Sequence, residues 1–207
     1  LLGQRIKSLK KRLEKVRSQR DQGRRSRQRA GVPVVSLVGY TNVGKSTLFN
    51  RMTASDVYAD DRLFATLDPT LRRFRIADTE PLILADTVGF IRQLPHDLVE
   101  SFSSTLEETR DASLLLHVVD AAAVDRDELM KHVDDVLQQI GADELPQLII
   151  YNKIDCLENV QPKLERDQQG KIRRIWLSAH TGEGLDLLRL ALQEYFPEQL
   201  SAIESVN

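Results

Sequence analysis

The sequence predicts an α/β fold in which helices cover both faces of a mainly parallel sheet. Short apolar runs of strand length recur along the chain, rich in β-branched residues and nearly continuous, as in strands buried on both faces. Segments with helical periodicity separate these runs, and the alternation favours right-handed crossovers between parallel strands. With 207 residues and 41% hydrophobic content, the chain is long enough to bury one globular core.

The expected elements follow one another from residue 34 to residue 195. The buried strands are expected at 34–38, 82–85, 114–119, 148–151 and 175–177. The helices are expected at 45–53, 97–111, 125–140 and 185–195. Apolar and polar residues alternate more regularly in 71–77, which indicates an antiparallel strand at one edge of the sheet.

A basic segment precedes this pattern. Residues 1–30 contain 12 of the 29 Lys and Arg residues and two of the 31 Asp and Glu, so their net charge is +10 and that of the remainder is −12. Apolar residues recur there at spacings of four and three, which predicts a basic amphipathic helix that packs on another helix. They are Leu2, Ile6, Leu9, Leu13 and Val16. Its basic side is either a solvated coiled-coil face or an arm that contacts RNA, and both interpretations stay open.

We expect a basic helical linker segment over 1–30, a globular domain over 31–198 and a C-terminal tail over 199–207. Because the chain begins with Leu1 rather than Met, we expect it to be part of a longer protein. The sequence has no apolar run of about 18–20 residues, the length that a membrane span needs. The single cysteine, Cys156, excludes an internal disulfide. These features predict a soluble, cytoplasmic protein.

Residues 39–46 read G-Y-T-N-V-G-K-S and match G-x-x-x-x-G-K-[ST] between an expected strand and an expected helix. In such a loop the glycines let backbone N–H groups close around phosphate oxygens, and the helix N-terminus faces the same charge. Lys45 would neutralise the β- and γ-phosphates, and the hydroxyl of Ser46 would bind Mg²⁺. Chance produces such a string in on the order of one chain in a hundred, so we discard a chance match in this context. The candidate nucleotide-binding residues here are Gly39, Tyr40, Thr41, Asn42, Val43, Gly44, Lys45, Ser46 and Thr47.

A second motif, D-T-V-G at 86–89, follows the strand expected at 82–85. Asp86 would hold Mg²⁺ through a water molecule, and the N–H of Gly89 would bond the γ-phosphate. By itself D-x-x-G is a common turn, but its position after a strand downstream of the phosphate loop favours the functional interpretation. The candidate residues are Asp86, Thr87, Val88 and Gly89.

A third motif, N-K-I-D at 152–155, predicts which base is bound. Asp155 can accept hydrogen bonds from guanine N1 and N2, which adenine does not offer, and such polar complementarity discriminates by roughly 10⁴ or more. Asn152 can bond the N7 side of the base and tie this loop to the phosphate loop, and the alkyl stem of Lys153 can cover the base plane. The candidate residues are Asn152, Lys153, Ile154 and Asp155.

A fourth motif, S-A-H at 178–180, follows the last expected strand. There the N–H of Ala179 can donate to guanine O6, while Ser178 and His180 are included as neighbours in the same loop, and we assign His180 no chemistry. The N-K-I-D motif alone fits a solvated turn. Its order behind the first two motifs, each at a strand end, makes a purely structural origin of the three rarer than about one in a thousand.

In this order the motifs resemble those of Ras-like, translation-factor-type P-loop GTPases, over residues 33 to about 197. More narrowly, the chain is similar to the HflX family of ribosome-associated GTPases through G-Y-T-N-V-G-K-S-T-L-F-N at 39–50, L-F-A-T-L-D-P-T at 63–70 and D-T-V-G-F-I at 86–91. The resemblance implies a GTP-binding domain over 31–198 that hydrolyses GTP to GDP. It also implies action on the large ribosomal subunit, with splitting of stalled or idle ribosomes by the full-length protein.

The resemblance further implies that residues 64–68 form part of a first switch loop, with Thr66 as its magnesium-sensing residue. A hydroxyl there can reach both Mg²⁺ and the γ-phosphate and order the loop only with GTP. Thr70 is the alternative, although it abuts the expected edge strand and can simply end the loop. The switch candidates are Phe64, Ala65, Thr66, Leu67 and Asp68, and Lys45, Thr66 and Gly89 are the expected catalytic residues.

Phe90 follows Gly89 where Ras-like enzymes place a glutamine that orients the attacking water. We therefore expect slow intrinsic hydrolysis, stimulated by a partner. In some relatives with a hydrophobic residue there, an asparagine at the position of Asn42 helps to hold K⁺, so K⁺ beside the phosphates is a further expectation. We expect a monomer.

Three functions remain to be compared: a GTPase switch, a module that binds GTP or GDP without hydrolysing it, and a P-loop ATPase or phosphotransferase. Asp155 disfavours the third, and Phe90 makes the second conceivable.

Overall fold

The computed structural model describes residues 29–54, 70–76, 81–87, 89 and 109–197, together with 15, 18, 22, 23, 25, 26 and 106. By its contacts the chain divides into two compact units, Leu1–Pro33 and Val34–Asn207. Within the first unit, the described residues from Lys15 to Arg29 are helical, and the N–H of Ala30 donates to the carbonyl of Ser26 at 3.0 Å. The five apolar positions of the predicted amphipathic helix lie outside the described residues, so that helix stays a prediction.

The second unit is built on a seven-stranded sheet with the order β2-β3-β1-β4-β5-β7-β6. Strands β1, β3, β4, β5 and β7 run parallel to one another, while β2 and β6 are antiparallel at the two edges. The strands are β1 (Val34–Val38), β2 (Thr70–Phe74), β3 (Leu82–Asp86), β4 (Leu114–Asp120), β5 (Gln147–Asn152), β6 (Lys163–Arg166) and β7 (Ile172–Trp176). The predicted α/β fold with a mainly parallel sheet is confirmed, including the antiparallel edge strand near 71–77.

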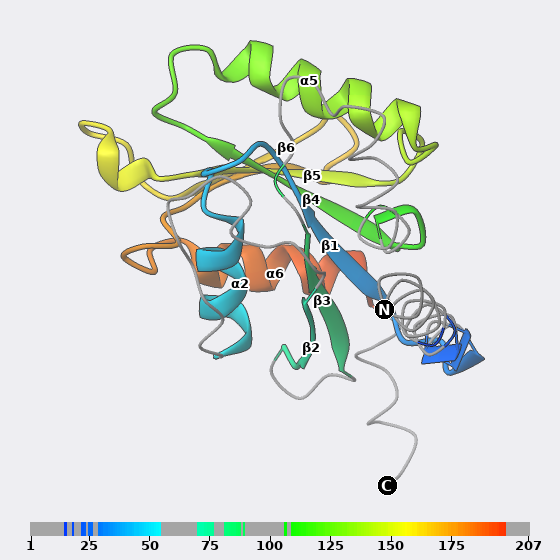
Figure 1. Cartoon of the computed structure of the whole chain (residues 1–207). Helices are drawn as coiled ribbons and strands as arrows, with labels where there is room; N and C mark the ends of the chain where they lie inside the picture. The colour runs from blue at the N-terminus through cyan, green and yellow to red at the C-terminus, as the bar shows by residue number, and fades with distance from the viewer. Residues whose placement is uncertain are drawn as a thin grey trace, which may run out of the picture. The chain divides into compact units, whose positions relative to one another are not determined.

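Helices cover both faces of this sheet, with α5 on one face and α2 and α6 on the other (Figure 1). The helical elements are α2 (Lys45–Thr53), α5 (Arg126–Gln139), α6 (Leu185–Tyr195) and the short 3₁₀ helix η1 (Ile154–Cys156). Of the helix expected at 97–111, the described residues Leu106, Thr109 and Arg110 are helical. Across the described part of the chain, none of the helices has both the length and the apolar character needed to cross a membrane.

The alternation of side chains along each strand divides the core into two layers. Leu114 and Leu116 of β4 belong to the cluster that packs against α2 and α6, whereas Leu115, between them, packs with Val133 and Leu137 of α5. Because strands such as β4 are buried on both sides, their sequence reads as a nearly continuous apolar run, which in β4 is interrupted by the buried His117.

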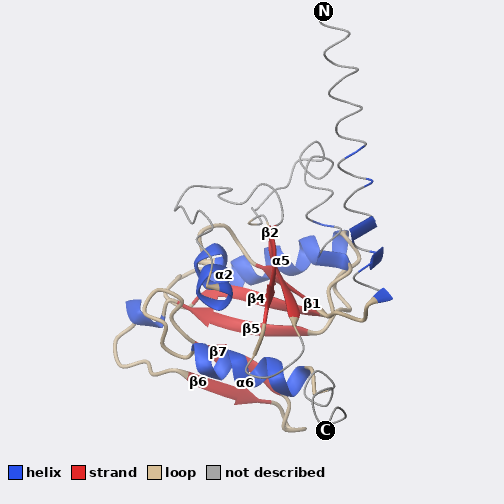
Figure 2. Ribbon diagram, turned by 90° about the horizontal axis from the view of Figure 1, so that it is seen from below, coloured by secondary structure: helices blue, strands red, loops and turns tan. Residues whose placement is uncertain are grey.

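Strand β6 was missed by the sequence analysis. It lies at one edge of the sheet, as Figure 2 shows, and among the described strands it pairs only with β7. Its sequence K-L-E-R has one apolar residue, Leu164, which is half-buried together with Glu165, while Lys163 and Arg166 are exposed, because an edge strand can keep charges toward water. Strand β7 also begins at Ile172, earlier than predicted.

Candidate functional site

The phosphate loop connects β1 to α2 and adopts a conformation that requires its two glycines. Gly39 and Gly44 have φ angles of 148° and 93°. A Cβ added to Gly39 would lie 2.3 Å from the carbonyl oxygen of Val118, and one added to Gly44 would lie 2.4 Å from Nδ2 of Asn152. Helix α2 begins directly after Gly44 and has no side-chain cap at its N-terminus. Its first N–H groups therefore face the loop, an arrangement that favours an anion.

Lys45 is almost completely buried, with 6% of its surface exposed. Its Nζ donates to the carbonyl oxygens of Gly39 at 3.1 Å and Tyr40 at 2.8 Å. Burial lowers the pKa of Lys45 to about 8, and the carboxylate of Asp86 partly opposes this effect. A second anion beside the ammonium would strengthen its charged form, as a bound phosphate would.

Asp86, the last residue of β3, lies next to Ser46 at the start of α2. The Ser46 hydroxyl donates to Asp86 Oδ2 at 2.7 Å, and the Asp86 side chain is fully buried. Thr87 follows, and its hydroxyl donates to the carbonyl of Leu37 in β1. Two hard oxygen donors beside a phosphate loop suit Mg²⁺. Among the described residues, no group of three or more His, Cys, Asp or Glu side chains that could hold a metal occurs.

Gly89 lies against the phosphate loop. A Cβ added there would lie 2.7 Å from Cγ2 of Thr41 and 3.1 Å from Nζ of Lys45. The second motif therefore reaches the first, and a side chain at position 89 would collide with the loop.

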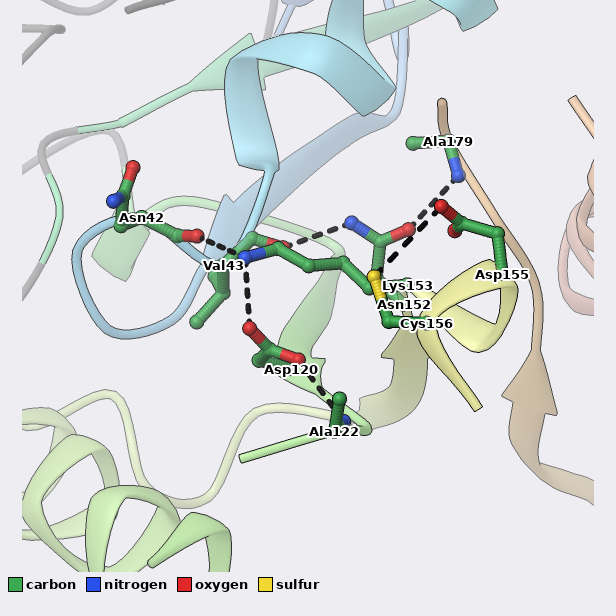
Figure 3. Close-up of polar contacts among 9 residues, drawn as sticks. All are labelled: Asn42, Val43, Asp120, Ala122, Asn152, Lys153, Asp155, Cys156 and Ala179. Atoms are coloured by element: carbon green, nitrogen blue, oxygen red, sulfur yellow. Dashed lines mark hydrogen bonds and ion pairs between the residues drawn. The ribbon is translucent and has the colours of Figure 1, made fainter. Parts of the chain in front are cut away.

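Asn152 ends β5 and connects three loops through its side chain (Figure 3). Its Nδ2 donates to the carbonyl oxygen of Val43 at 2.8 Å, and its Oδ1 accepts from the N–H of Ala179 at 2.8 Å. The predicted tie between the base loop (the N-K-I-D motif at 152–155) and the phosphate loop (39–46) is therefore present. The Ala179 N–H, which was expected to donate to guanine O6, donates to Asn152 Oδ1 in this structure, and its contact with the base stays a prediction.

Lys153 makes a second connection to the phosphate loop. Its Nζ donates to the carbonyl oxygen of Asn42 at 2.7 Å and forms an ion pair with Oδ2 of Asp120, also at 2.7 Å. For Lys153 the sequence predicted only that its alkyl stem covers the base plane, and Asp120 was not among the predicted site residues. Asp120 could have been found from the sequence as a candidate site residue, because it ends an apolar run just as Asp86 does.

The remaining base-loop residues lie on η1 and after β7. Asp155 is exposed on η1, where Cys156 Sγ approaches its Oδ2 at 3.9 Å. Ser178 is buried and its Oγ accepts from the N–H of Thr181 at 3.1 Å, which shapes the turn. Sequence reasoning also missed Arg51 of α2, whose Nε donates to the Ala179 carbonyl at 3.2 Å and whose Nη2 donates to the exposed His180 carbonyl.

Several predicted site residues lie outside the described part of the chain. They are Phe64, Ala65, Thr66, Leu67, Asp68, Val88 and Phe90. The alternative to Thr66, Thr70, is the first residue of β2 and pairs with Asp86 of β3. The switch-loop and Phe90 assignments stay predictions.

The comparisons with known proteins agree on a family. The model of the family described as "50S ribosome-binding GTPase" matches residues 34–153. GTPase HflX of Escherichia coli (strain K12) is 59% identical over 194 residues, which cover 94% of this chain and 46% of that protein. GTPase HflX of Caldanaerobacter subterraneus subsp. tengcongensis is 49% identical, over 94% of this chain and 44% of that protein. The chain thus spans about half the length of the curated relatives it matches.

Solved structures show the same fold. A GTP-binding protein from the hyperthermophilic archaeon Sulfolobus solfataricus, in complex with GDP, has a TM-score of 0.63 and 25% identity, and the match covers 94% of this chain and 58% of that one. A single-residue variant of Aquifex aeolicus Era bound to GDP.AlF4- has a TM-score of 0.63 at 21% identity, over 79% and 56% of the two chains, a likeness of fold. The family match over residues 34–153 and the HflX relatives together show that this chain belongs to the 50S ribosome-binding GTPase family, as a GTPase domain of the HflX type.

Proposed function

We propose that this chain binds guanine nucleotides and hydrolyses GTP to GDP and phosphate. The observation that carries the proposal is the pair of side-chain links from the base loop to the phosphate loop, Asn152 to Val43 and Lys153 to Asn42, each 2.7 or 2.8 Å long. A module that bound phosphate alone would have no use for such links. They bring a base-reading carboxylate and a phosphate cradle into one site.

In this proposal Asp155 selects guanine by accepting from its N1 and N2 groups. Its exposed position at the surface of η1 leaves the carboxylate open to a base. The Ala179 N–H would have to leave Asn152 Oδ1, or share it, in order to donate to O6. Nucleotide binding is therefore expected to rearrange the contact between β5 and the loop at 178–180.

The phosphate end is proposed to act through Lys45, Ser46, Asp86 and Gly89. Lys45 would balance the charge on the transferred phosphoryl group, and the N–H of Gly89 would bond its oxygens. Ser46, Asp86 through water, and Thr66 of the switch loop would hold Mg²⁺, which when bound neutralises developing negative charge on the phosphates. The buried position of Lys45 makes its positive charge more effective, because little water screens it.

We further propose that hydrolysis by the isolated chain is slow and that the large ribosomal subunit accelerates it. A phenyl ring at position 90 cannot orient the attacking water by hydrogen bonding. The name of the matching family makes the large subunit the first partner to test. For a full-length protein, the resemblance to the HflX family leads us to propose splitting of stalled or idle ribosomes. Cytoplasmic location and a monomeric state belong to the same proposal.

We also propose that K⁺ binds beside the phosphates with the help of Asn42. Its backbone carbonyl is taken by Lys153, and its side chain is directed away from that ammonium (Figure 3). The amide oxygen can therefore approach a monovalent cation without competing with Lys153.

The deciding experiment compares turnover of GTP and ATP by this chain and by a full-length relative, each with and without purified large ribosomal subunits. We expect slow GTP turnover, no ATP turnover, and acceleration of GTP turnover by roughly 10³-fold or more when a full-length relative docks on the subunit. Tight GTP binding with no hydrolysis under either condition would favour a non-catalytic nucleotide-binding module. Equal use of ATP would remove Asp155 from base selection.

A further inference from the structure

Asp120 is a charged residue at the nucleotide site that belongs to none of the four motifs. It is the last residue of β4, and its side chain is 21% exposed. Both carboxylate oxygens are engaged (Figure 3): Oδ2 accepts from Lys153 Nζ at 2.7 Å, and Oδ1 accepts from the N–H of Ala122 at 3.0 Å. The bond from Ala122 fixes the orientation of the carboxylate, so that Oδ2 meets the ammonium of Lys153 in one defined position.

The backbone holds the two partners together as well. Asp120 is in register with Asn152 across the parallel pair β4–β5, and the N–H of Ala121 donates to the Asn152 carbonyl at 2.8 Å. Lys153 follows directly, in a left-handed conformation with φ of 66°. Because both residues sit on paired strand ends, little further ordering is needed to form their ion pair.

The ammonium of Lys153 lies between a carboxylate and the phosphate loop. Its side chain is 33% exposed, so water competes for it, and a neutral carbonyl alone holds an ammonium weakly in such a setting. The charge-assisted bond to Asp120 is the stronger of its two contacts. Removing the charge at position 120 would therefore loosen the contact between Lys153 and the Asn42 carbonyl.

We propose that Asp120 is a positioning residue that controls how long a guanine nucleotide stays bound. It acts through Lys153: the carboxylate holds the ammonium against the Asn42 carbonyl, and this keeps the base loop closed on the phosphate loop around the nucleotide. The inference rests on the proposed function, because it takes the bound molecule to be GDP or GTP. Asp120 itself touches neither base nor phosphate.

A purely structural role for Asp120 is the alternative, in which its bond to Ala122 shapes the turn after β4. The two roles differ in whether Asp120 affects nucleotide release by holding Lys153 in place. Asp120→Asn keeps a side-chain oxygen for the Ala122 N–H and replaces the oxygen that faces Lys153 with an NH2 group, which removes both the charge and the acceptor there. A structural role predicts little effect of this change on nucleotide release.

The experiment follows release of fluorescent mant-GDP by stopped flow from the 207-residue chain and from Asp120→Asn, Lys153→Met and the double variant. Asp143→Asn, which removes the same charge from an exposed site between α5 and β5, is the control. We expect release to be about 3- to 10-fold faster in Asp120→Asn, the range for losing a partly exposed charge-assisted bond, and unchanged in the control. The double variant should release GDP no faster than Lys153→Met alone, since interacting residues are not additive.

Two further measurements keep the outcomes separate. Thermal unfolding of each variant shows whether it is folded, and the control Asp143→Asn should leave single-turnover hydrolysis of pre-bound GTP within about twofold of that of the unmodified chain. Unchanged release in a folded Asp120→Asn variant, or additive effects in the double variant, would overturn the inference while leaving the proposed function intact. Absence of any mant-GDP binding by the unmodified chain would refute the proposed function and this inference with it.

Discussion

Replacing Lys45 by Met should stabilise the nucleotide-free chain at pH 7 while abolishing tight GTP binding. Burial lowers the pKa of Lys45 from an ordinary value of 10.5 to about 8. A lowering of this size means that keeping the ammonium charged inside the fold costs about 3 kcal/mol. Methionine removes this cost but leaves the Gly39 and Tyr40 carbonyls without their donor, at about 1 kcal/mol each. The expected net gain is about 1 kcal/mol, or a Tm higher by roughly 2–4 °C.

The contribution of Lys45 to the free energy of unfolding should also depend on pH. Because the folded pKa is depressed, the folded chain releases this proton near pH 8 while the unfolded chain keeps it up to pH 10.5. The unfolded state then binds more protons, so stability rises with pH through this window. Between pH 7 and pH 9.5 the unmodified chain should gain about 2 kcal/mol from Lys45, a gain that Lys45→Met lacks. The advantage of the variant should thus disappear or reverse.

The assay is thermal and urea unfolding of both proteins at the two pH values, without nucleotide, alongside GTP binding at pH 7. Lys131→Met, at an exposed position on α5, is the matched control for losing a lysine charge. A Lys45→Met variant less stable than the unmodified chain at pH 7, or a stability difference that does not change with pH, would refute the burial argument. Native-like GTP affinity in this variant would refute the phosphate-site assignment.

Three other predictions concern selectivity, stability and ions. Asp155→Asn should shift preference from GTP toward xanthosine triphosphate, because an amide can donate to the oxygen at position 2 of xanthine; a nucleotide competition assay that still favours GTP would contradict the role. Asn152→Ala should lower the free energy of unfolding by about 2–5 kcal/mol in urea titrations, since it leaves the buried Val43 carbonyl and Ala179 N–H without partners. Hydrolysis should be faster in K⁺ than in Na⁺ at matched ionic strength if Asn42 helps to bind the cation, and equal rates would exclude it.

Elements marked by a continuous apolar run or by an apolar stripe were predictable from the sequence. Strand β1 and helices α2 and α6 have the predicted bounds, because an apolar run or an apolar stripe is itself the record of burial. Strand β7 was predicted too late and too short, since Arg173 and Arg174 interrupt its apolar pattern. Their partners, Asp167 at 2.8 Å and Glu165 at 3.5 Å, lie on the neighbouring hairpin, and that pairing cannot be read from the strand alone.

The site was predictable where its residues are local in sequence. Lys45, Ser46, Asp86 and Gly89 meet as the order of motifs and strand ends predicts, although their contacts with nucleotide remain proposals. Of the links between loops, the one from Asn152 to the phosphate loop was predicted, whereas the one from Lys153 was not, because it depends on which side chain fills a particular gap between strand ends. The ion pair of Asp120 with Lys153 is such a case, and the register of β4 with β5 is needed to see it.

The two links from the base loop also bear on how phosphate is bound. Asn152 and Lys153 both bond carbonyl oxygens of the phosphate loop, those of Val43 and Asn42. In a trans peptide unit the N–H points opposite to the C=O, so drawing these two carbonyls toward the base loop turns the N–H groups of Gly44 and Val43 to the other side. Those N–H groups are among the ones that a phosphate loop directs at its anion. The base loop therefore helps to orient the phosphate-binding backbone, and weakening either link should reduce affinity for GDP more than affinity for guanosine.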